Sequence, residues 1–316
     1  VDVAAIEVSS HALALHRVDE INFSVAAFTN LTQDHLDFHE DMEDYFRAKA
    51  SLFERRRAAR AVVWVDDPYG FRLASQIDTP VTRVGLGPDA DVRAVSIEAT
   101  PTGSRFELAL RGDSCPVELP LGGAFNVENA LVAAACAAEL GLTLDVIYRG
   151  LRDVAQIPGR FEKIEVGQAF AVIVDYAHTP EGIVAVVDAA RTVSQGDIIV
   201  VVGAGGDRDR LKRPLMGRAA ARADVVVVTS DNPRSEDPRA IVDEVVGGAG
   251  EGDAVLHVEP DRRSAIRTAV GMASADDVVL ILGKGHEQGQ EISGRIEPFD
   301  DRLVAREELA DLEVAS

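Results

Sequence analysis

Lysine is scarce in this chain, which has 28 arginines but only four lysines, Lys49, Lys163, Lys212 and Lys284. Arginine therefore meets the ordinary need for positive charge. Lysine has a compact ammonium group whose pKa falls readily on burial, whereas a guanidinium stays charged. We expect some of these lysines to perform chemistry that arginine cannot.

Cysteine is also scarce, since Cys115 and Cys136 are the only two and neither lies in a metal or redox motif. This excludes a disulfide scaffold and a cysteine zinc site, and it suits a reducing, cytoplasmic compartment. The longest apolar runs are too short to span a bilayer, so we expect no membrane insertion.

Positive charge is in deficit, with 32 basic against 53 acidic residues and a net charge of −21. That balance disfavours nucleic acid as a partner, although local arginines can still bind small anions. The chain begins VDVAAIEVSSHAL, without an initiator Met or a signal segment, and we expect it to be a fragment. Its 316 residues are enough for two domains with separate cores.

The first half of the chain has mixed patterns. Residues 2–8 predict a buried strand, and shorter strands are expected at 62–65 and 104–110. Helices are expected at the ranges 42–53, 126–140 and 144–154. Pro158 and Gly159, in QIPGRFE, then indicate a hinge.

The second half is regular, with apolar strands alternating with helical segments. The strands are expected at 171–175, 198–202, 225–229, 255–258 and 278–282. This alternation predicts an α/β fold with a doubly wound, largely parallel sheet. Four of the strands run directly into the polar segments DYAHTPE, GAGGDRDR, SDNPR and GKGHEQG. Because ligands of such sheets bind beyond the carboxyl ends of the strands, we predict a binding site there.

A candidate metal site lies near the start of the chain. The carboxylates of Glu7 and Asp34 suit Mg²⁺, and His35 could serve a softer or second cation. The alternative is that DHLDFHEDMED is only a solvated acidic turn that caps the next helix.

Lys49 lies on a helical turn flanked by apolar residues. A desolvated, neutral amine there could react with CO₂, and the carbamate would offer two oxygens to a metal. The alternative is an ordinary helix lysine paired with Glu43 or Asp44.

The glycines at 203–206 resemble a dinucleotide-binding loop, but Arg208 replaces the third glycine, so a Rossmann cofactor is poorly supported. Arg208, Arg210, Lys212 and Arg213 form a basic cluster suited to phosphate or carboxylate. It could also be merely the charged start of the next helix.

Three further segments carry candidate ligand contacts. In SDNPR, Pro233 restricts the backbone and Arg234 offers a fork to a carboxylate, unless the segment is only a turn. In GKGHE, Glu287 could accept a hydrogen bond from an amine. His178 could stack on or hydrogen-bond a base, or simply lie at the surface.

Taken in order, EVSSHAL, FTNLTQDHLDFH, YFRAKASLF, GAFNVENALVA, PGRFE, VDYAHTPE, GAGGDRDRLKRPLMGR, SDNPR and GKGHE resemble the Mur ligase family along essentially the whole chain. The resemblance implies part of a central ATP-binding α/β domain at 1–156 and a Rossmann-like, amino-acid-binding domain at 157–316. The family's phosphate loop, G-x-x-x-x-G-K-[ST], does not occur in this chain. We therefore expect these residues alone to be inactive or nearly so.

The resemblance also implies an activity, ATP-dependent amide formation in peptidoglycan synthesis by a monomer that uses two Mg²⁺ ions. The D-glutamyl γ-carboxylate of a UDP-muramoyl dipeptide would form an acyl phosphate, which the amine of meso-diaminopimelate would then attack. Arg234 favours diaminopimelate over L-lysine, since lysine lacks the distal carboxylate. A lysine-adding ligase and a non-catalytic binding paralogue are the alternatives.

Individual roles follow from the resemblance by position. The implied catalytic and metal-binding residues are Glu7, His35 and Lys49 as its carbamate. Contacts to the UDP-muramoyl dipeptide are implied for Ser9 and Arg17. The segments that hold ATP contribute Asn126, Asn129, Arg160, Asp175, His178 and Lys212. The diaminopimelate site is implied to comprise Arg208, Asp231, Asn232, Pro233, Arg234, Gly283 and Glu287.

Overall fold

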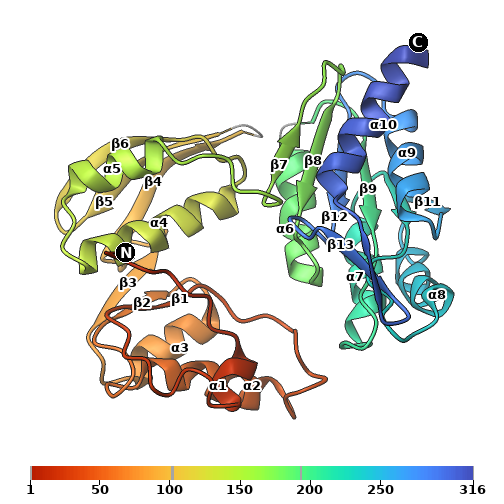
Figure 1. Ribbon diagram of the computed structural model, residues 1–316. Helices are drawn as coiled ribbons and strands as arrows, with labels where there is room; N and C mark the ends of the chain where they lie inside the picture. Colours follow the sequence, from red (N-terminus) through yellow and green to blue (C-terminus); the bar gives the residue numbers. More distant parts are fainter. Residues whose placement is uncertain (1, 101–102, 193, 316) are drawn as a thin grey trace. The chain divides into compact units, whose positions relative to one another are not determined.

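The computed structural model describes residues 2–100, 103–192 and 194–315, and the chain divides into two compact units (Figure 1). The first unit ends at Val154, and Ala155 begins the main part of the second. No helix among these residues is long and apolar enough to cross a membrane.

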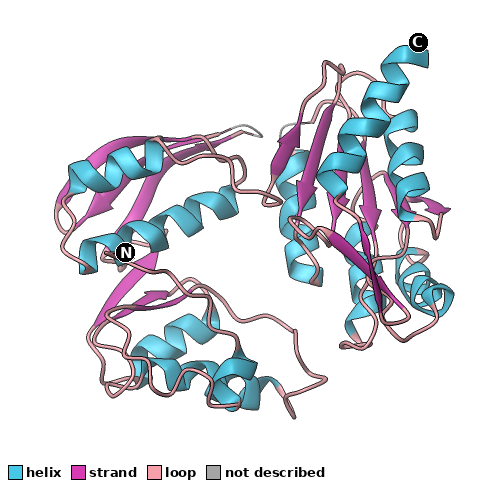
Figure 2. Ribbon diagram, in the orientation of Figure 1, coloured by secondary structure: helices cyan, strands magenta, loops and turns pink. Residues whose placement is uncertain are grey.

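The first unit contains a six-stranded sheet whose strands follow one another in chain order, β1 to β6, within the described residues. Strands β1 to β4 are parallel, and β4, β5 and β6 are antiparallel (Figure 2). The strands are β1 Ala26–Phe28, β2 Ala61–Trp64, β3 Val81–Gly85, β4 Val92–Ala99, β5 Ser104–Leu110 and β6 Asp113–Leu119. The strands predicted at 62–65 and 104–110 are thus confirmed as β2 and β5.

The helices of this unit begin at polar caps and bury one face. Asp41 caps α2, since its Oδ1 accepts from the backbone N–H of Asp44 at 2.7 Å. The predicted helix at 42–53 is confirmed as α2 followed by a short 3₁₀ turn, Ser51–Phe53. The helices are α1 Ser10–Ala14, α2 Met42–Ala50, α3 Pro68–Gln76, α4 Ala124–Glu139 and α5 Leu144–Arg152.

The predicted strand at residues 2–8 is wrong. The segment has no regular secondary structure, and Val3 and Ile6 are 61% and 55% exposed. An apolar pattern indicates only a face, whereas a strand also needs a neighbour to pair with its backbone N–H and C=O groups. No described strand pairs with residues 2–8, and β1, at the edge of the sheet, pairs only with β2.

The second unit contains the predicted doubly wound sheet, in the order β11-β10-β9-β12-β8-β7. All neighbours are parallel except the edge strand β7, which is antiparallel to β8. The strands are β7 Glu162–Ile164, β8 Ala171–Asp175, β9 Ile198–Val202, β10 Val225–Val228, β11 Val255–Val258 and β12 Val278–Leu282. Their Val- and Ile-rich runs suit strands that are covered on both faces.

Helices cover both faces of this sheet. The helices α6, α7 and α8 pack together on one face, and α9 and α10 pack on the other. Their bounds are α6 Pro180–Arg191, α7 Lys212–Ala220, α8 Pro238–Ala249, α9 Arg262–Met272 and α10 Asp301–Ala315. A hairpin that the sequence pattern did not predict, β13 Gly289–Ile292 with β14 Arg295–Pro298, follows β12.

The strand order gathers the four polar loops. After β11 the chain returns through α9 and places β12 between β9 and β8. The carboxyl ends of β8, β12, β9 and β10 therefore lie side by side, and each continues into one of the polar segments. Adjacent strand ends where the order reverses are the usual binding position in such folds.

Candidate functional site

Lys49 lies in the last turn of α2, close to two carboxylates. Burial lowers the pKa of the Lys49 amine, and the charges of Glu7 and Asp34 partly oppose this shift. Its Nζ lies 5.4 Å from the centroid of the Tyr45 ring. A lowered pKa increases the fraction of neutral amine, which is the form that reacts with CO₂.

The alternative pairing of Lys49 is not formed. Glu43 is held by Arg72, at 2.6 and 2.7 Å, and Asp44 accepts from His39 Nδ1 at 3.0 Å. Among the described residues, neither carboxylate pairs with Lys49. The environment of Lys49 is therefore that of a partly desolvated amine rather than of a surface ion pair.

The acidic segment before α2 forms an aromatic and imidazole cluster. His35 adopts a left-handed φ of 58°, and Asp34 Oδ1 accepts from its backbone N–H at 2.9 Å. The His11 and His35 rings are 4.8 Å apart, and the His39 ring stacks on Tyr45 at 5.1 Å. The segment thus caps α2 through Asp41, as the alternative interpretation predicted, while Asp34 lies near Lys49 and its metal-binding role stays a prediction.

The donor set around Lys49 fits a hard cation. Glu7 and Asp34 offer carboxylate oxygens, which Mg²⁺ prefers, and a carbamate would add two more. Side chains of His, Cys, Asp and Glu do not form a group of three suited to a metal anywhere in the part of the chain that the structure describes.

The remaining candidates of the first unit lie on helices or turns. Ser9 caps α1, since its Oγ accepts from the backbone N–H of Ala12 at 3.1 Å, and Arg17 is exposed just beyond that helix. Asn126 and Asn129 lie one turn apart on α4, with Asn129 Nδ2 3.4 Å from Asn126 Oδ1.

Asp175 joins two loops of the second unit. Its Oδ2 accepts from the backbone N–H of Phe161 and its Oδ1 from that of Ala177, both at 2.7 Å. Burial raises the pKa of this carboxyl. Asp175 therefore holds PGRFE against DYAHTPE, a structural role that the motif alone did not indicate.

Three segments meet around Tyr176. Gly159 has φ +65°, and a Cβ there would lie 2.1 Å from the backbone N of His286, so only glycine allows PGRFE to approach GKGHE. Around the Tyr176 ring lie Arg160 Cζ at 4.6 Å and the rings of His178 and His286 at 4.7 and 5.2 Å. This arrangement offers cationic and aromatic surfaces to a ligand.

The glycines at 203–206 serve loop packing. A Cβ on Gly206 would lie 2.0 Å from the carbonyl oxygen of Pro233, and Gly206 N donates to Asn232 O at 2.8 Å. GAGGDRDR and SDNPR are therefore in direct backbone contact. This contact accounts for the glycines without a dinucleotide.

The predicted basic cluster is only partly correct. Arg213 is fully buried and pairs with Glu236 at 2.6 Å and Glu244 at 2.9 Å, and Arg210 pairs with Glu244 at 2.5 Å. These two arginines are thus neutralised by acids from a later segment. Arg208 is exposed, while Lys212 is buried at the start of α7.

Arg234 lies between the second polar loop and the β13 strand. It adopts a φ of 52°, its Nη1 donates to Gly206 O at 2.6 Å, and its Nε lies 3.4 Å from Glu291 Oε2. No described residue accepts from its Nη2. The guanidinium is held at one side and keeps a nitrogen for a ligand oxygen.

Lys284 connects the loops that follow β10 and β12. Its side chain is fully buried, and Nζ donates to Asn232 Oδ1 at 3.1 Å, Glu287 Oε2 at 3.0 Å and Gly289 O at 2.7 Å. Asn232 Nδ2 also donates to Glu287 Oε2, at 2.8 Å. Sequence reasoning found no role for Lys284; its place in GKGHE was the only available signal.

The neighbouring acid Asp231 is almost completely buried beneath these loops, and burial raises its pKa. Gln290 Nε2 donates to Asp231 O at 2.6 Å, and a Cβ on Gly283 would lie 2.7 Å from Asp231 Oδ2. Sequence analysis did not identify Gln290, because the β13–β14 hairpin gave no clear strand pattern.

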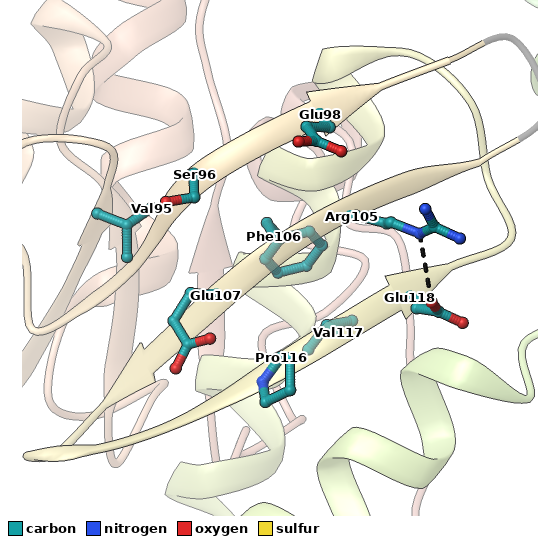
Figure 3. Close-up of a pocket in the computed structure, with 9 residues that line it drawn as sticks. All are labelled: Val95, Ser96, Glu98, Arg105, Phe106, Glu107, Pro116, Val117 and Glu118. Atoms are coloured by element: carbon teal, nitrogen blue, oxygen red, sulfur yellow. Dashed lines mark ion pairs between the residues drawn. The ribbon is translucent and has the colours of Figure 1, made fainter.

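A hollow elsewhere in the first unit contains none of the candidate residues. It lies on the antiparallel strands β4, β5 and β6, and Figure 3 shows the residues that line it. Its arginine, Arg105, pairs with Glu118, with Nε 3.2 Å from Oε1. Glu7 and Asp34 lie instead near Lys49, and most candidates of the second unit lie in the loops that follow its strands.

Comparison with known proteins matches two domain models to successive parts of this chain. The model of the Mur ligase middle domain matches residues 1–137, and that of the Mur ligase, glutamate ligase domain matches residues 159–285. The UDP-N-acetylmuramoyl-L-alanyl-D-glutamate–2,6-diaminopimelate ligase of Streptomyces avermitilis is 47% identical over 315 residues, covering 97% of this chain and 62% of that protein. The chain thus spans about 62% of the length of this curated relative.

Two solved structures are similar. A ligase of the same name is 35% identical with a TM-score of 0.60, over 97% of this chain and 64% of that one. A pseudomurein peptide ligase type C from Methanothermus fervidus, 20% identical with a TM-score of 0.73, matches over 96% and 66% and shows the shared fold. With both domain models matched in order, this chain belongs to the Mur ligase family.

Proposed function

We propose that the protein containing this chain is an ATP-dependent ligase that joins meso-diaminopimelate to UDP-N-acetylmuramoyl-L-alanyl-D-glutamate. The observation that carries the proposal is that one loop cluster contains both an anchored cation, Arg234, and an anchored anion, Glu287. Arg234 lies close enough to Glu287 to contribute to lowering the pKa of that carboxyl. Such a pair is complementary to the carboxylate and ammonium groups of an amino acid.

Arg234 supports diaminopimelate over L-lysine. Its Nη2 would donate to the carboxylate at the distal centre, which lysine lacks, while Asn232 and Glu287 bind an amino acid centre. A charged hydrogen bond of this kind contributes about 1.5–3 kcal/mol, or roughly ten- to a hundred-fold in discrimination. Arg208, Asp231, Pro233 and Gly283 complete the proposed site. The names of the relatives point to the same amino acid.

The proposed reaction has two steps. A γ-carboxylate oxygen of the D-glutamyl residue attacks the γ-phosphorus of ATP, ADP leaves, and an acyl phosphate forms. The amine of diaminopimelate then attacks the acyl carbon, loses its proton, and inorganic phosphate leaves.

We assign ATP binding to two groups of residues. Arg160 and His178 flank the Tyr176 ring and form a surface on which a base can stack. Asp175 holds that loop in place, and Asn126, Asn129 and Lys212 are proposed as further ATP contacts. Ser9 and Arg17 are proposed to contact the UDP-muramoyl dipeptide.

Magnesium is proposed to bind at Glu7, His35 and the carbamate of Lys49, as two ions. Bound Mg²⁺ would neutralise the negative charge of the phosphates and the acyl group. The oxygen donors around Lys49 and the lowered pKa of its amine support this assignment.

Activity of the 316 residues alone is a separate matter. Without a G-x-x-x-x-G-K-[ST] loop they lack the usual backbone cradle for ATP phosphates. We propose that these residues alone have little or no ligase activity. The whole protein is proposed to be a cytoplasmic monomer, in keeping with the free thiols of Cys115 and Cys136.

The test is ADP release by the full-length protein with ATP and the UDP-muramoyl dipeptide. We expect release to require an added amino acid and to be much faster with meso-diaminopimelate than with L-lysine. Faster ADP release with L-lysine would mean that lysine, and not diaminopimelate, is the amino acid that the protein adds. No release with any amino acid would favour the non-catalytic paralogue.

A further inference from the structure

We propose that Lys284 is a positioning residue of the amino-acid site. Together with the Asn232 amide, which donates to the same carboxylate, it fixes Glu287, against which the incoming ammonium group binds. The inference rests on the proposed function and deepens it. Lys284 lies between two of the residues assigned to diaminopimelate, yet no role follows for it from the motif.

The geometry excludes direct contact of Lys284 with a substrate. An ammonium group has three N–H donors. All three are used, by Asn232 Oδ1 at 3.1 Å, Glu287 Oε2 at 3.0 Å and Gly289 O at 2.7 Å. The side chain is also fully buried. Lys284 can therefore act only through the groups that it holds.

Glu287 is held at one oxygen only. Its Oε2 accepts from both Lys284 Nζ and Asn232 Nδ2, whereas no described residue donates to its Oε1. The side chain is 34% exposed. One carboxylate oxygen is thus anchored while the other remains able to accept from an ammonium group of the substrate.

Electrostatics support the same role. Burial raises the pKa of Glu287, but the charge of Lys284 and the hydrogen bonds from Asn232 and Lys284 outweigh it, and the net pKa is lowered. Arg234 adds a smaller effect of the same sign. Asp231 and Arg262 also act electrostatically on this carboxyl, with opposite signs. Removing Lys284 would take away the largest effect that opposes burial and would leave the Asn232 hydrogen bond and the Arg234 charge.

This role explains the choice of lysine in an arginine-rich chain. A compact ammonium reaches three acceptors that converge in a closed space, whereas a planar guanidinium is larger and directs its donors as a fork. Gly285 next to it has φ +52°, and a Cβ there would lie 2.7 Å from Tyr176 Cβ, so the loop has no room to expand. We expect Lys284→Arg not to restore function.

The test is Lys284→Met in the full-length protein, with affinities for meso-diaminopimelate and ATP measured by calorimetry across a pH series. Met keeps the length of the side chain and removes its charge and donors. We expect diaminopimelate affinity to fall about ten- to a hundred-fold, with ATP affinity within about twofold of wild type. Because Glu287 would then protonate at higher pH, the acid limb of diaminopimelate binding should move to higher pH.

A double-mutant cycle shows whether Lys284 acts through Glu287. In a Glu287→Gln background, Lys284→Met should cause little further loss of affinity. Lys163→Met is the matched control, since Lys163 pairs with Glu165 near the surface, and it should bind like wild type. If Lys284→Met does not fold, Lys284→Gln, which retains an amide donor, takes its place with the same expectations.

The outcomes separate this inference from the proposed function. Failure of the wild-type protein to bind diaminopimelate would overturn both. Wild-type binding with unchanged affinity and acid limb in Lys284→Met would overturn the positioning role alone. If Lys284→Met lost affinity equally for diaminopimelate and ATP at every pH, Lys284 would be a general structural residue. That result would also overturn the positioning role.

Discussion

Arg262 and Asp301 form a two-pronged ion pair in which both side chains are completely buried, with Nε–Oδ1 and Nη2–Oδ2 distances of 2.8 and 2.6 Å. Arg262 also donates to Leu282 O at 2.9 Å and to Ser230 O at 3.4 Å. The Arg262 guanidinium therefore connects the first residues of α9 and α10 to the backbone just after β10 and at the end of β12. GKGHE and SDNPR begin there, so the pair supports the loops that carry Lys284 and Arg234.

Breaking this pair should be costly. Arg262→Met leaves the Asp301 charge buried without its partner, and the free energy of unfolding should fall by about 3–5 kcal/mol. Urea denaturation followed by circular dichroism measures the change. A double variant, Arg262→Met with Asp301→Leu, should lose clearly less stability because the Asp301 charge is then no longer buried without its partner.

A surface pair provides the control. Arg222 and Asp188 are 53% and 51% exposed, and Arg222→Ala should cost only about 0–1 kcal/mol. If Arg262→Met cost no more than Arg222→Ala, the buried pair would not be a structural anchor.

Lys49 should be essential for activity. Lys49→Ala in the full-length protein removes the amine that we propose to be carbamylated, and ligase activity should be lost. A short carboxylic acid added to the assay should restore part of it by replacing the carbamate oxygens. Lys163→Ala, at a partly exposed position, should have normal activity.

The carbamate itself can be observed. Isotopically labelled CO₂ should give a carbamate carbon signal in the wild-type spectrum, and that signal should be missing in Lys49→Ala. Full turnover by Lys49→Ala would show that the amine has no part in the reaction.

Arg234→Ala should affect one substrate selectively. Loss of a charged hydrogen bond to the distal carboxylate should raise KM for diaminopimelate about ten- to a hundred-fold and leave KM for ATP nearly unchanged. Arg239→Ala, an exposed arginine on α8, is the matched control and should leave both constants unchanged. Equal increases in both KM values would mean that Arg234 does not recognise the amino acid.

Glu236 gives a pH-dependent prediction. The hydrogen bonds from Arg213, aided by the backbone N–H of Asp207, lower the pKa of Glu236 from 4.5 to about 2 against the effect of burial. A lowered pKa in the folded state stabilises the fold above pH 4.5, and this contribution is lost as the pH falls towards 2. Glu236→Gln should thus be destabilised at neutral pH and approach wild type in acid.

Urea denaturation across this pH range provides the measurement. Glu297→Gln is the control, since Glu297 is exposed on β14 and its replacement should change stability little at any pH. If the free energy of unfolding of Glu236→Gln stayed below that of wild type by the same amount down to acid pH, the ion pair between Arg213 and Glu236 would not be what stabilises this region.

Much of the second unit could be predicted from local pattern. The strands β8, β9, β11 and β12 have the predicted bounds because their short apolar runs are flanked by polar residues. The meeting of the four loops also followed, since parallel strands place their carboxyl ends on one edge. The predicted roles of individual residues in these loops remain predictions.

Other predictions needed partners that local pattern does not contain. Residues 2–8 look like a strand, but no described strand pairs with them. Arg210 and Arg213 look like an anion site until Glu236 and Glu244, which follow them by more than twenty residues, are brought alongside. The β13–β14 hairpin was missed because its residues, GQEI and RIEP, are mostly polar and give no clear apolar alternation.

The amino-acid sequence by itself determined the family, the parallel sheet and the loops in which function should lie, because hydrophobic periodicity and motif order are local properties. Only the tertiary structure decided the surroundings of the scarce lysines. Lys49 is left partly desolvated near two carboxylates, whereas Lys284 is fully buried with three acceptors from separate segments. The charge and availability of a side chain depend on burial and on partners that are distant in sequence, and only folding brings those partners together.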